Sequence, residues 1–334
     1  MEPIFVIAGR ITREYILPPV GVPLLDVAGG SALYAAGGLL LWDTELGLLA
    51  RVGEDYPRAR LREIQSRGID TTGVEIVQQS IDLRTFYSYD AKFEGTHGSP
   101  VSQFARRGLT FPKTLLGYQS PREPAGERSR PDAAASAGLK IPSSYLGARA
   151  IHLCPLDLSA HRHLVNAFKA GAATTLTVDP SPDYMVPRLM KELRVALAGV
   201  TAFLPSEDEI RSLFWGETYD LWEMAAGLSE SGCEAIVIKR GSSGQAVYDG
   251  RSRDKWEIPA YPARLADPTG VGDAFCGGFL AGYRSTYDPL QAALYGNVSA
   301  SLKLEGSGAF YPLSTLSGLA QARLDVLKEL VRTV

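Results

Sequence analysis

Short, nearly continuous apolar runs alternate along the chain with stretches whose apolar residues recur at helical spacing. The runs at residues 4–8 and 48–52 are apolar at almost every position, which is typical of strands buried on both faces. The stretches at residues 31–42 and 57–66 predict helices. Further strands are predicted at residues 151–155, 176–179, 202–204 and 235–239, and further helices at 161–169, 184–198, 207–214 and 219–229. This alternation predicts an α/β fold with a mostly parallel central sheet and helices on both faces.

Two segments depart from this alternation. Residues 81–89 have the composition of a strand but no helix follows them, so they predict a small β lid built from residues 12–24 and 80–106. Residues 106–144 are rich in proline, arginine, serine and alanine and predict an irregular insertion, whose simplest interpretation is a solvated excursion without function. No internal repeat is evident, so residues 1–334 are interpreted as a single domain.

Composition and charge narrow the classes of function. Hydrophobic residues make up 45% of the chain and charged residues 21%, as in globular proteins with a sizeable core. The net charge of −3 gives no broad basic field for nucleic acid or an anionic membrane, so neither is an expected partner. The apolar run at residues 39–42 is far shorter than the about 20 residues that cross a bilayer, and no signal peptide is evident. The expectation is a cytoplasmic protein whose phosphate binding, if any, comes from a local site.

The strongest chemical signal is the run Asp-Pro-Thr-Gly-Val-Gly-Asp at residues 267–273. Gly270 and Gly272 permit unusual backbone dihedrals and a close approach of a ligand. The N–H groups and the dipole at the start of the helix that follows would favour an anion. Asp273 would then lie beside the anion, placed to accept a proton from a hydroxyl that attacks phosphorus. The alternative is a plain helix start with Asp273 as a capping residue, and the local features do not separate the two.

This run resembles the Asp-Thr-x-Gly-Ala-Gly-Asp signature of the ribokinase-like (PfkB-type) carbohydrate kinases. The resemblance implies a ribokinase-like fold and an enzyme that transfers the γ-phosphate of ATP to a hydroxyl of a sugar or sugar-like acceptor. It also implies that Asp273 is the general base and that the backbone of Gly270, Val271 and Gly272 forms an anion hole. Pro268 replaces the usual Thr or Ser and Val271 replaces Ala, and neither change removes a reacting group.

Two further segments resemble the parts of this family that bind the acceptor. Gly29 and Gly30 match its Gly-Gly-x-x-x-Asn-x-Ala motif, although Tyr34 stands where Asn is common. A tight helix entry with small residues is the structural alternative, and both interpretations can hold at once. Glu14 and Asp26 are the two candidate carboxylates for acceptor hydroxyls, and an exposed loop acid is the alternative for each.

The predicted lid adds one more candidate for the acceptor. Arg84 is positioned to contact it, together with the aromatic residues Phe86, Tyr87 and Tyr89. Packing within the lid sheet is the alternative for the aromatics, and it is favoured for at least two of the three.

The resemblance also implies a nucleotide site. Ser206 and Glu209 resemble the Asn-x-x-Glu motif that helps to hold magnesium, with Glu209 as the metal-binding acid and Ser206 in place of Asn. The alternative is a capping box at a helix start. Lys239 or its neighbour Arg240 would neutralise phosphate charge at a strand end, and either could instead be a solvated residue. The remaining nucleotide contacts implied are Gly241, Gly244, Thr269 and Asn297.

Three hypotheses for function follow. The first is a sugar kinase that uses ATP and Mg²⁺. The second is a nucleoside kinase of the same family, for which Tyr34 could stack on a base. The third is a ligand-binding relative without turnover, which the retained Asp273 and Glu209 disfavour. A dinucleotide-dependent oxidoreductase is disfavoured because the first strand is not followed by Gly-x-Gly-x-x-Gly. The resemblance leaves open a homodimer through the lid and activation by a monovalent cation.

Overall fold

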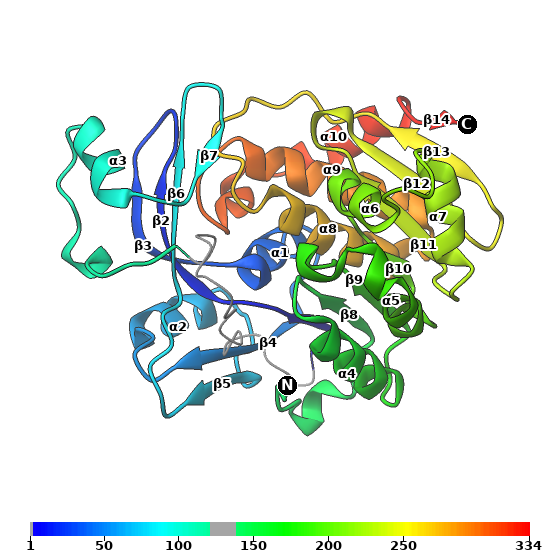
Figure 1. Cartoon of the computed structure of the whole chain (residues 1–334), viewed down its shortest axis with the longest axis horizontal. Helices are drawn as coiled ribbons and strands as arrows, with labels where there is room; N and C mark the ends of the chain where they lie inside the picture. The colour runs from blue at the N-terminus through cyan, green and yellow to red at the C-terminus, as the bar shows by residue number, and fades with distance from the viewer. Residues whose placement is uncertain (1–2, 121–137) are drawn as a thin grey trace.

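The molecule is built around a ten-stranded sheet with the order β14-β13-β12-β11-β10-β9-β8-β1-β4-β5 (Figure 1). The structure, a computed structural model, describes residues 3–120 and 138–334. The strands of this sheet are β1 (Phe5–Ala8), β4 (Leu46–Gly53), β5 (Val74–Val77), β8 (Ala150–Leu153), β9 (Thr175–Val178), β10 (Ala202–Phe203), β11 (Ala235–Lys239), β12 (Gln245–Asp249), β13 (Lys255–Ile258) and β14 (Arg332–Thr333). Pairing is parallel from β5 to β11, and β12 to β14 add an antiparallel edge. The predicted, mostly parallel sheet is confirmed.

Helices cover both faces of this sheet. Successive residues of each strand point to opposite sides, so each strand contributes side chains to two cores. Val6 of β1 packs in one core with α4 to α7, whereas Phe5 and Ile7 pack in the other with α1 and α2. Val237 of β11 likewise faces α8 to α10, away from its neighbours in the strand. The helices are α1 (Ser31–Leu39), α2 (Arg58–Gln65), α3 (Pro100–Arg106), α4 (Leu158–Lys169), α5 (Met190–Leu197), α6 (Glu207–Leu213), α7 (Leu221–Ser229), α8 (Val271–Thr286), α9 (Pro289–Leu304) and α10 (Leu319–Lys328).

A second sheet, for which the name lid is kept, has the order β3-β2-β6-β7 (left of Figure 1). Its strands are β2 (Thr12–Leu17), β3 (Leu24–Gly29), β6 (Arg84–Tyr89) and β7 (Gly95–Thr96). The first arm therefore runs to Gly29, beyond the predicted boundary at residue 24, because β3 pairs with β2 along its length. Phe86 packs in a small core of this lid with Tyr15 and Phe104. Lid packing, the alternative considered for the aromatic residues, is correct for Phe86.

The predicted insertion is only partly within the described residues. Residues 121–137 of the segment 106–144 lie outside them. The described part is irregular, with 3-10 turns at Lys113–Leu115 and Ser143–Tyr145. No helix of the described residues is long and apolar enough to cross a membrane.

Candidate functional site

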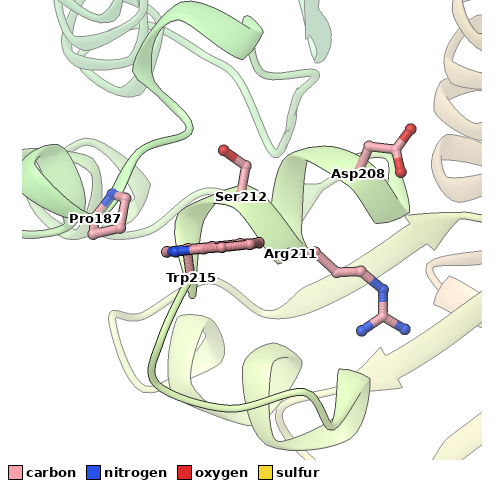
Figure 2. A pocket seen from close by; sticks show the side chains of 5 residues that line it. All are labelled: Pro187, Asp208, Arg211, Ser212 and Trp215. Carbon is pink, nitrogen blue, oxygen red and sulfur yellow. The ribbon is translucent and has the colours of Figure 1, made fainter.

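A cavity of about 280 Å³ lies where the lid meets the first turn of α8. It is lined by Glu14, Gly30, Ser31, Tyr34, Tyr87, Tyr89, His97, Pro268, Thr269, Gly270 and Asp273. A wider hollow of about 420 Å³ lies beside α6, with Pro187, Asp208, Arg211, Ser212 and Trp215 around it (Figure 2). That hollow holds none of the predicted site residues, and the Trp215 side chain at its rim is 75% exposed. Of the site residues predicted from the sequence, the smaller cavity is lined by Glu14, Gly30, Tyr34, Thr269, Gly270 and Asp273.

The start of α8 has the geometry of an anion site. Gly270 precedes the helix with φ 70° and ψ 13°, a left-handed conformation that favours glycine. A Cβ at Gly270 would also lie 2.1 Å from the ring of Tyr34. The N–H groups of Gly272 and Asp273 belong to the first turn and have no acceptor within the helix. The Val271 N–H donates to the carbonyl oxygen of Pro268 at 3.4 Å. No side chain of the described residues caps this helix, so the N–H groups of Gly272 and Asp273 are available to an anion.

Asp273 is the third residue of α8 and does not cap the helix. Within residues 3–120 and 138–334 no hydrogen bond holds its carboxylate, which lines the cavity. Burial, and then the nearby carboxylate of Asp179, raise the pKa of Asp273 to about 7. Glu14 and Glu209 add to this rise, and the ammonium of Lys239 opposes it. A carboxylate with a pKa near neutrality is well matched to accept a proton at physiological pH.

Lys239 brings a positive charge to the anion hole. Its Nζ lies 2.7 Å from Oδ1 of Asp179 and 3.8 Å from the position that a Cβ on Gly272 would take. Burial disfavours the charge, yet the neighbouring Asp179 carboxylate raises the pKa of Lys239 above its ordinary value. Arg240, the alternative considered for this role, instead pairs with Glu207 and Glu257. The ammonium next to the helix start is therefore that of Lys239.

Asp179 was missed in the sequence. It follows β9 directly, at the carboxyl end of a parallel strand, which is where ligands bind in sheets of this kind. That position was the available signal. Asp179 also accepts a hydrogen bond from the Cys276 thiol at 3.4 Å, so β9, β11 and α8 meet through this one carboxylate.

Glu14 is a second buried carboxylate that lines the cavity. Its Oε1 accepts the Gly30 N–H at 2.8 Å, and its Oε2 accepts the Tyr34 hydroxyl at 2.7 Å. A Cβ on Gly29 would lie 2.0 Å from Glu14 Cδ, so glycine is needed for this approach. Burial raises the pKa of Glu14, and the hydrogen bonds from Tyr34 and Gly30 oppose that rise. The Gly29-Gly30 segment and the segment that carries Glu14, which both resemble the family, thus meet at the buried Glu14 carboxylate.

The ring of Tyr34 is not exposed for stacking on a base, which the nucleoside hypothesis would require of it. Its ring packs against Gly270, and the ammonium of Lys303 lies 5.5 Å from the ring centroid. The side chain is 1% exposed. Tyr34 therefore supports Glu14 and the helix start, and the other rings that line the cavity are those of Tyr87, Tyr89 and His97. Of these, His97 was not singled out in the sequence.

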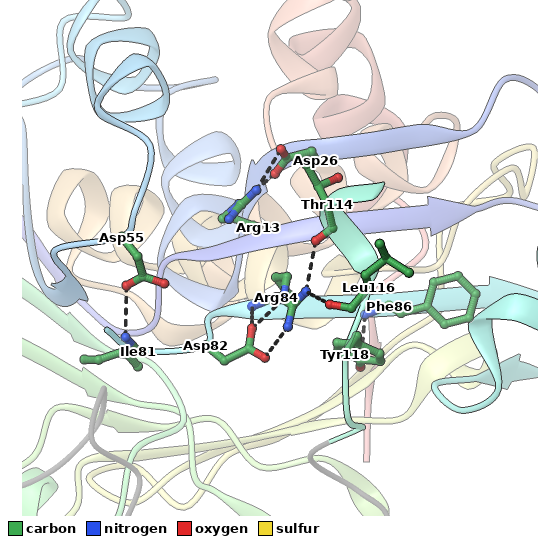
Figure 3. A network of polar contacts seen from close by, with 10 residues as sticks. All are labelled: Arg13, Asp26, Asp55, Ile81, Asp82, Arg84, Phe86, Thr114, Leu116 and Tyr118. Atoms are coloured by element: carbon green, nitrogen blue, oxygen red, sulfur yellow. Dashed lines mark hydrogen bonds and ion pairs between the residues drawn. The ribbon is translucent and has the colours of Figure 1, made fainter. Parts of the chain in front are cut away.

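The structure gives two predicted acceptor contacts other partners, as Figure 3 shows. Asp26 forms a bidentate ion pair with Arg13, at 2.7 and 2.9 Å. Arg84 binds Asp82 and the carbonyl oxygens of Thr114 and Leu116. Neither Asp26 nor Arg84 lines the cavity. Both hold the lid together, because their charges are satisfied within it.

Glu209 combines the two interpretations offered for it. Its Oε2 accepts hydrogen bonds from the N–H and the hydroxyl of Ser206, both at 2.7 Å, in a capping box. Ser206 forms an isolated parallel bridge with Lys239, which places this capping box beside the strand end that carries the Lys239 ammonium. No group of three or more metal-binding side chains occurs among the described residues. A single carboxylate fits Mg²⁺, which keeps most of its waters and takes other ligands from phosphates.

The remaining predicted nucleotide contacts divide into three kinds. Asn297 is buried and its amide binds Gln245 and the backbone at Pro259 and Tyr261, so it braces the fold. Thr269 lines the cavity and its hydroxyl shares a hydrogen bond with that of Tyr89 at 2.9 Å. Two glycines of the turn after β11 differ in their surroundings. Gly244 is required by the hairpin, because a Cβ there would lie 1.9 Å from the carbonyl oxygen of Ile258, whereas Gly241 faces open space.

The chain resembles known kinases in sequence and in structure. The family model described as pfkB family carbohydrate kinase matches residues 141–316. A cytidine kinase of Thermococcus kodakarensis is 29% identical over 281 residues, which cover 83% of this chain and 87% of that protein. The structure of a Burkholderia thailandensis nucleoside kinase in complex with inosine has a TM-score of 0.66 and 19% identity, and covers 96% of each chain. A fructokinase double mutant of Vibrio cholerae O395, bound to fructose, ADP and potassium, has a TM-score of 0.67 and 18% identity, and covers 98% of this chain and 99% of that one.

These likenesses confirm the family that residues 267–273 suggested. The structural matches extend over nearly the whole length of the described fold, and the family model covers more than half of the chain. The predicted ribokinase-like fold and the predicted phosphotransferase activity are therefore confirmed. This chain belongs to the pfkB family of carbohydrate kinases.

Proposed function

We propose that the protein transfers the γ-phosphate of ATP to a hydroxyl of a nucleoside, with Mg²⁺. The observation that carries the nucleoside is the wall of the cavity, which the rings of Tyr87, Tyr89 and His97 line together with Glu14 and Asp273. A nucleoside has a base with a flat π-face that can stack on aromatic rings and a ribose that offers hydroxyls, so it would use both kinds of surface. The likeness to a cytidine kinase supports the same acceptor class.

Each residue has a distinct role in the proposed reaction. Glu14 accepts a hydrogen bond from one acceptor hydroxyl and fixes its orientation. Asp273 accepts the proton of the hydroxyl that attacks phosphorus. The backbone N–H groups at the start of α8 and the ammonium of Lys239 stabilise the negative charge on the transferred phosphoryl group. Bound Mg²⁺ would neutralise phosphate charge, and Glu209 would hold it through water.

A free sugar is the second candidate. It would use the same Glu14 and Asp273, and the family's carbohydrate kinases favour it. The rings of the lid would then have no base to stack on. The two acceptor classes differ in whether those rings contribute to binding.

The acceptor class is tested by measuring ADP release from magnesium-ATP with a panel of nucleosides and sugars. We expect pyrimidine or purine nucleosides to give kcat/KM values about tenfold or more above those of ribose, fructose and inositol, since one stacked base contributes roughly 1–3 kcal/mol. Substitution of Tyr87 by alanine should reduce the nucleoside rate and leave any rate with a sugar unchanged. Turnover with a sugar and none with any nucleoside would overturn the proposal.

The acid side of the pH profile should report Asp273. Because the base acts only when deprotonated, kcat/KM should rise with pH through an apparent pKa of about 7. Asp179→Asn removes a neighbouring negative charge, so it should move this limb to lower pH. Rates of both proteins are measured between acid and neutral pH at constant ionic strength. A limb near the ordinary carboxyl value of about 4 would contradict the assignment.

A further inference from the structure

Lys303 is a charged side chain with no contact to solvent. It lies near the end of α9 and is 0% exposed. Its Nζ donates to the carbonyl oxygen of Gly306 at 2.8 Å and to that of Asp267 at 3.2 Å. Oδ2 of Asp267 lies 3.9 Å from the same nitrogen. Burial removes the hydration of the ammonium, and these oxygens must offset that loss.

Asp267 is the first residue of the anion-hole turn. Its Oδ1 accepts hydrogen bonds from the N–H and the hydroxyl of Thr269, at 2.9 and 2.6 Å. Its Oδ2 is buried and has no hydrogen-bond partner among the described residues. The ammonium of Lys303 is the cation that faces this oxygen, and it binds the carbonyl of the same residue. Lys303 therefore fixes both the backbone and the side chain at the point where the turn begins.

The acceptor side depends on the same ammonium. The Tyr34 ring lies close to both Lys303 and Gly270, and its hydroxyl donates to Glu14. The single charge of Lys303 thus supports both the anion-hole turn and Tyr34, the residue that holds the Glu14 carboxylate. Burial lowers the pKa of Lys303 to about 8, and the carboxylates of Asp267 and Glu14 limit the fall. The side chain is mostly charged at neutral pH.

We propose that Lys303 is a built-in cation that holds the anion-hole turn in its catalytic geometry, so that this kinase needs no alkali-metal ion. Two backbone carbonyl oxygens and a carboxylate oxygen around one positive centre are the kind of ligands that an alkali ion would take. In this chain a covalently attached ammonium supplies that charge. Lys303 is a positioning residue, because it acts through residues 267–270 and not on the substrate.

The first test uses the unaltered protein and rests on the proposed kinase reaction. ADP release is measured directly by chromatography in tetramethylammonium salts and then with potassium, rubidium or ammonium added, at fixed ionic strength. We expect the same rate in every salt. A rate that rises about tenfold or more with potassium, equivalent to roughly 1.4 kcal/mol, would overturn the proposal.

The second test replaces Lys303 by alanine, which leaves the two carbonyl oxygens and Asp267 around an empty space. We expect kcat to fall about tenfold in tetramethylammonium salts, the loss of roughly one charge-assisted contact, and to recover with potassium or ammonium. Lys328→Ala, at a surface lysine of α10 that is 42% exposed, is the matched control and should respond to no salt. A loss of activity that no cation restores would show a purely structural role and would overturn the proposal.

Thermal unfolding separates this inference from the proposed reaction. Potassium should raise the Tm of Lys303→Ala more than that of the unaltered protein, since only the variant has a site for it. This readout requires no turnover. A failure to find an acceptor would therefore leave it standing, whereas equal shifts in both proteins would count against the cation role. If the variant does not fold in any salt, the salt response of the unaltered protein alone decides.

Discussion

Replacing Asp273 by asparagine is expected to lower kcat by about 10²-fold to 10⁴-fold, the usual contribution of a positioned general base. The amide cannot accept the proton of the attacking hydroxyl, although its shape is nearly the same. Nucleotide binding should be unchanged or tighter, because a negative charge near the phosphates is removed. Acceptor-dependent ADP release and the affinity for ATP are measured separately. The split between kcat and binding identifies Asp273 as the base.

Stability provides the control for this variant. Asp273 is surrounded by the carboxylates of Asp179, Glu14 and Glu209, all of which raise its pKa. Loss of its charge therefore relieves repulsion, and the Tm should not fall. Asp26→Asn is the matched substitution at an acid outside the cavity, and its kcat should stay within about threefold of the unaltered value, as for surface changes of up to roughly 0.5 kcal/mol. Full activity in Asp273→Asn would refute the assignment.

Replacing Glu14 by glutamine is expected to raise the KM for the acceptor by about 10-fold to 100-fold, since hydrogen bonds to charged groups contribute roughly 1.5–3 kcal/mol. The amide oxygen can still accept the Gly30 N–H, and the amide group can donate to the Tyr34 hydroxyl, which can also accept. The pocket should therefore keep its shape while the acceptor loses a charged partner. KM for ATP should change little, because Glu14 lies on the acceptor side.

The comparison for this variant is another paired glutamate far from the cavity. Glu75 of β5 forms an ion pair with Arg51 at 2.9 Å, and Glu75→Gln should leave both KM values as they are. Acceptor KM is measured for both variants under saturating ATP. An unchanged acceptor KM in Glu14→Gln would mean that another group binds the reacting alcohol.

The main elements of the fold follow from local pattern. Continuous apolar runs predicted the parallel strands β1, β4, β8, β9 and β11, because a strand that is buried on both faces is apolar at nearly every position. The run at residues 267–273 likewise predicted its own geometry. The left-handed conformation of Gly270 and the helix start at Val271 depend on residues that are adjacent in sequence.

Which charged residues meet in the site depended on contacts across the fold. Glu14 and Asp26 looked alike in the sequence, yet pairing of β2 with β3 leaves Glu14 at the cavity and gives Asp26 to Arg13. Asn297 and Arg84 are occupied by partners that no local pattern indicates.

Asp179 and Lys303 were not singled out in the sequence, because neither belongs to a motif. Asp179 meets Lys239 from 60 residues away, and Lys303 meets the carbonyl oxygen of Asp267 from 36 residues away. Patterns of residue type thus predicted the elements and the Gly-rich turn, because those depend on neighbours along the chain. The role of a buried charge depends on the oxygens and nitrogens that packing brings within a few ångströms, and only the tertiary structure decides that.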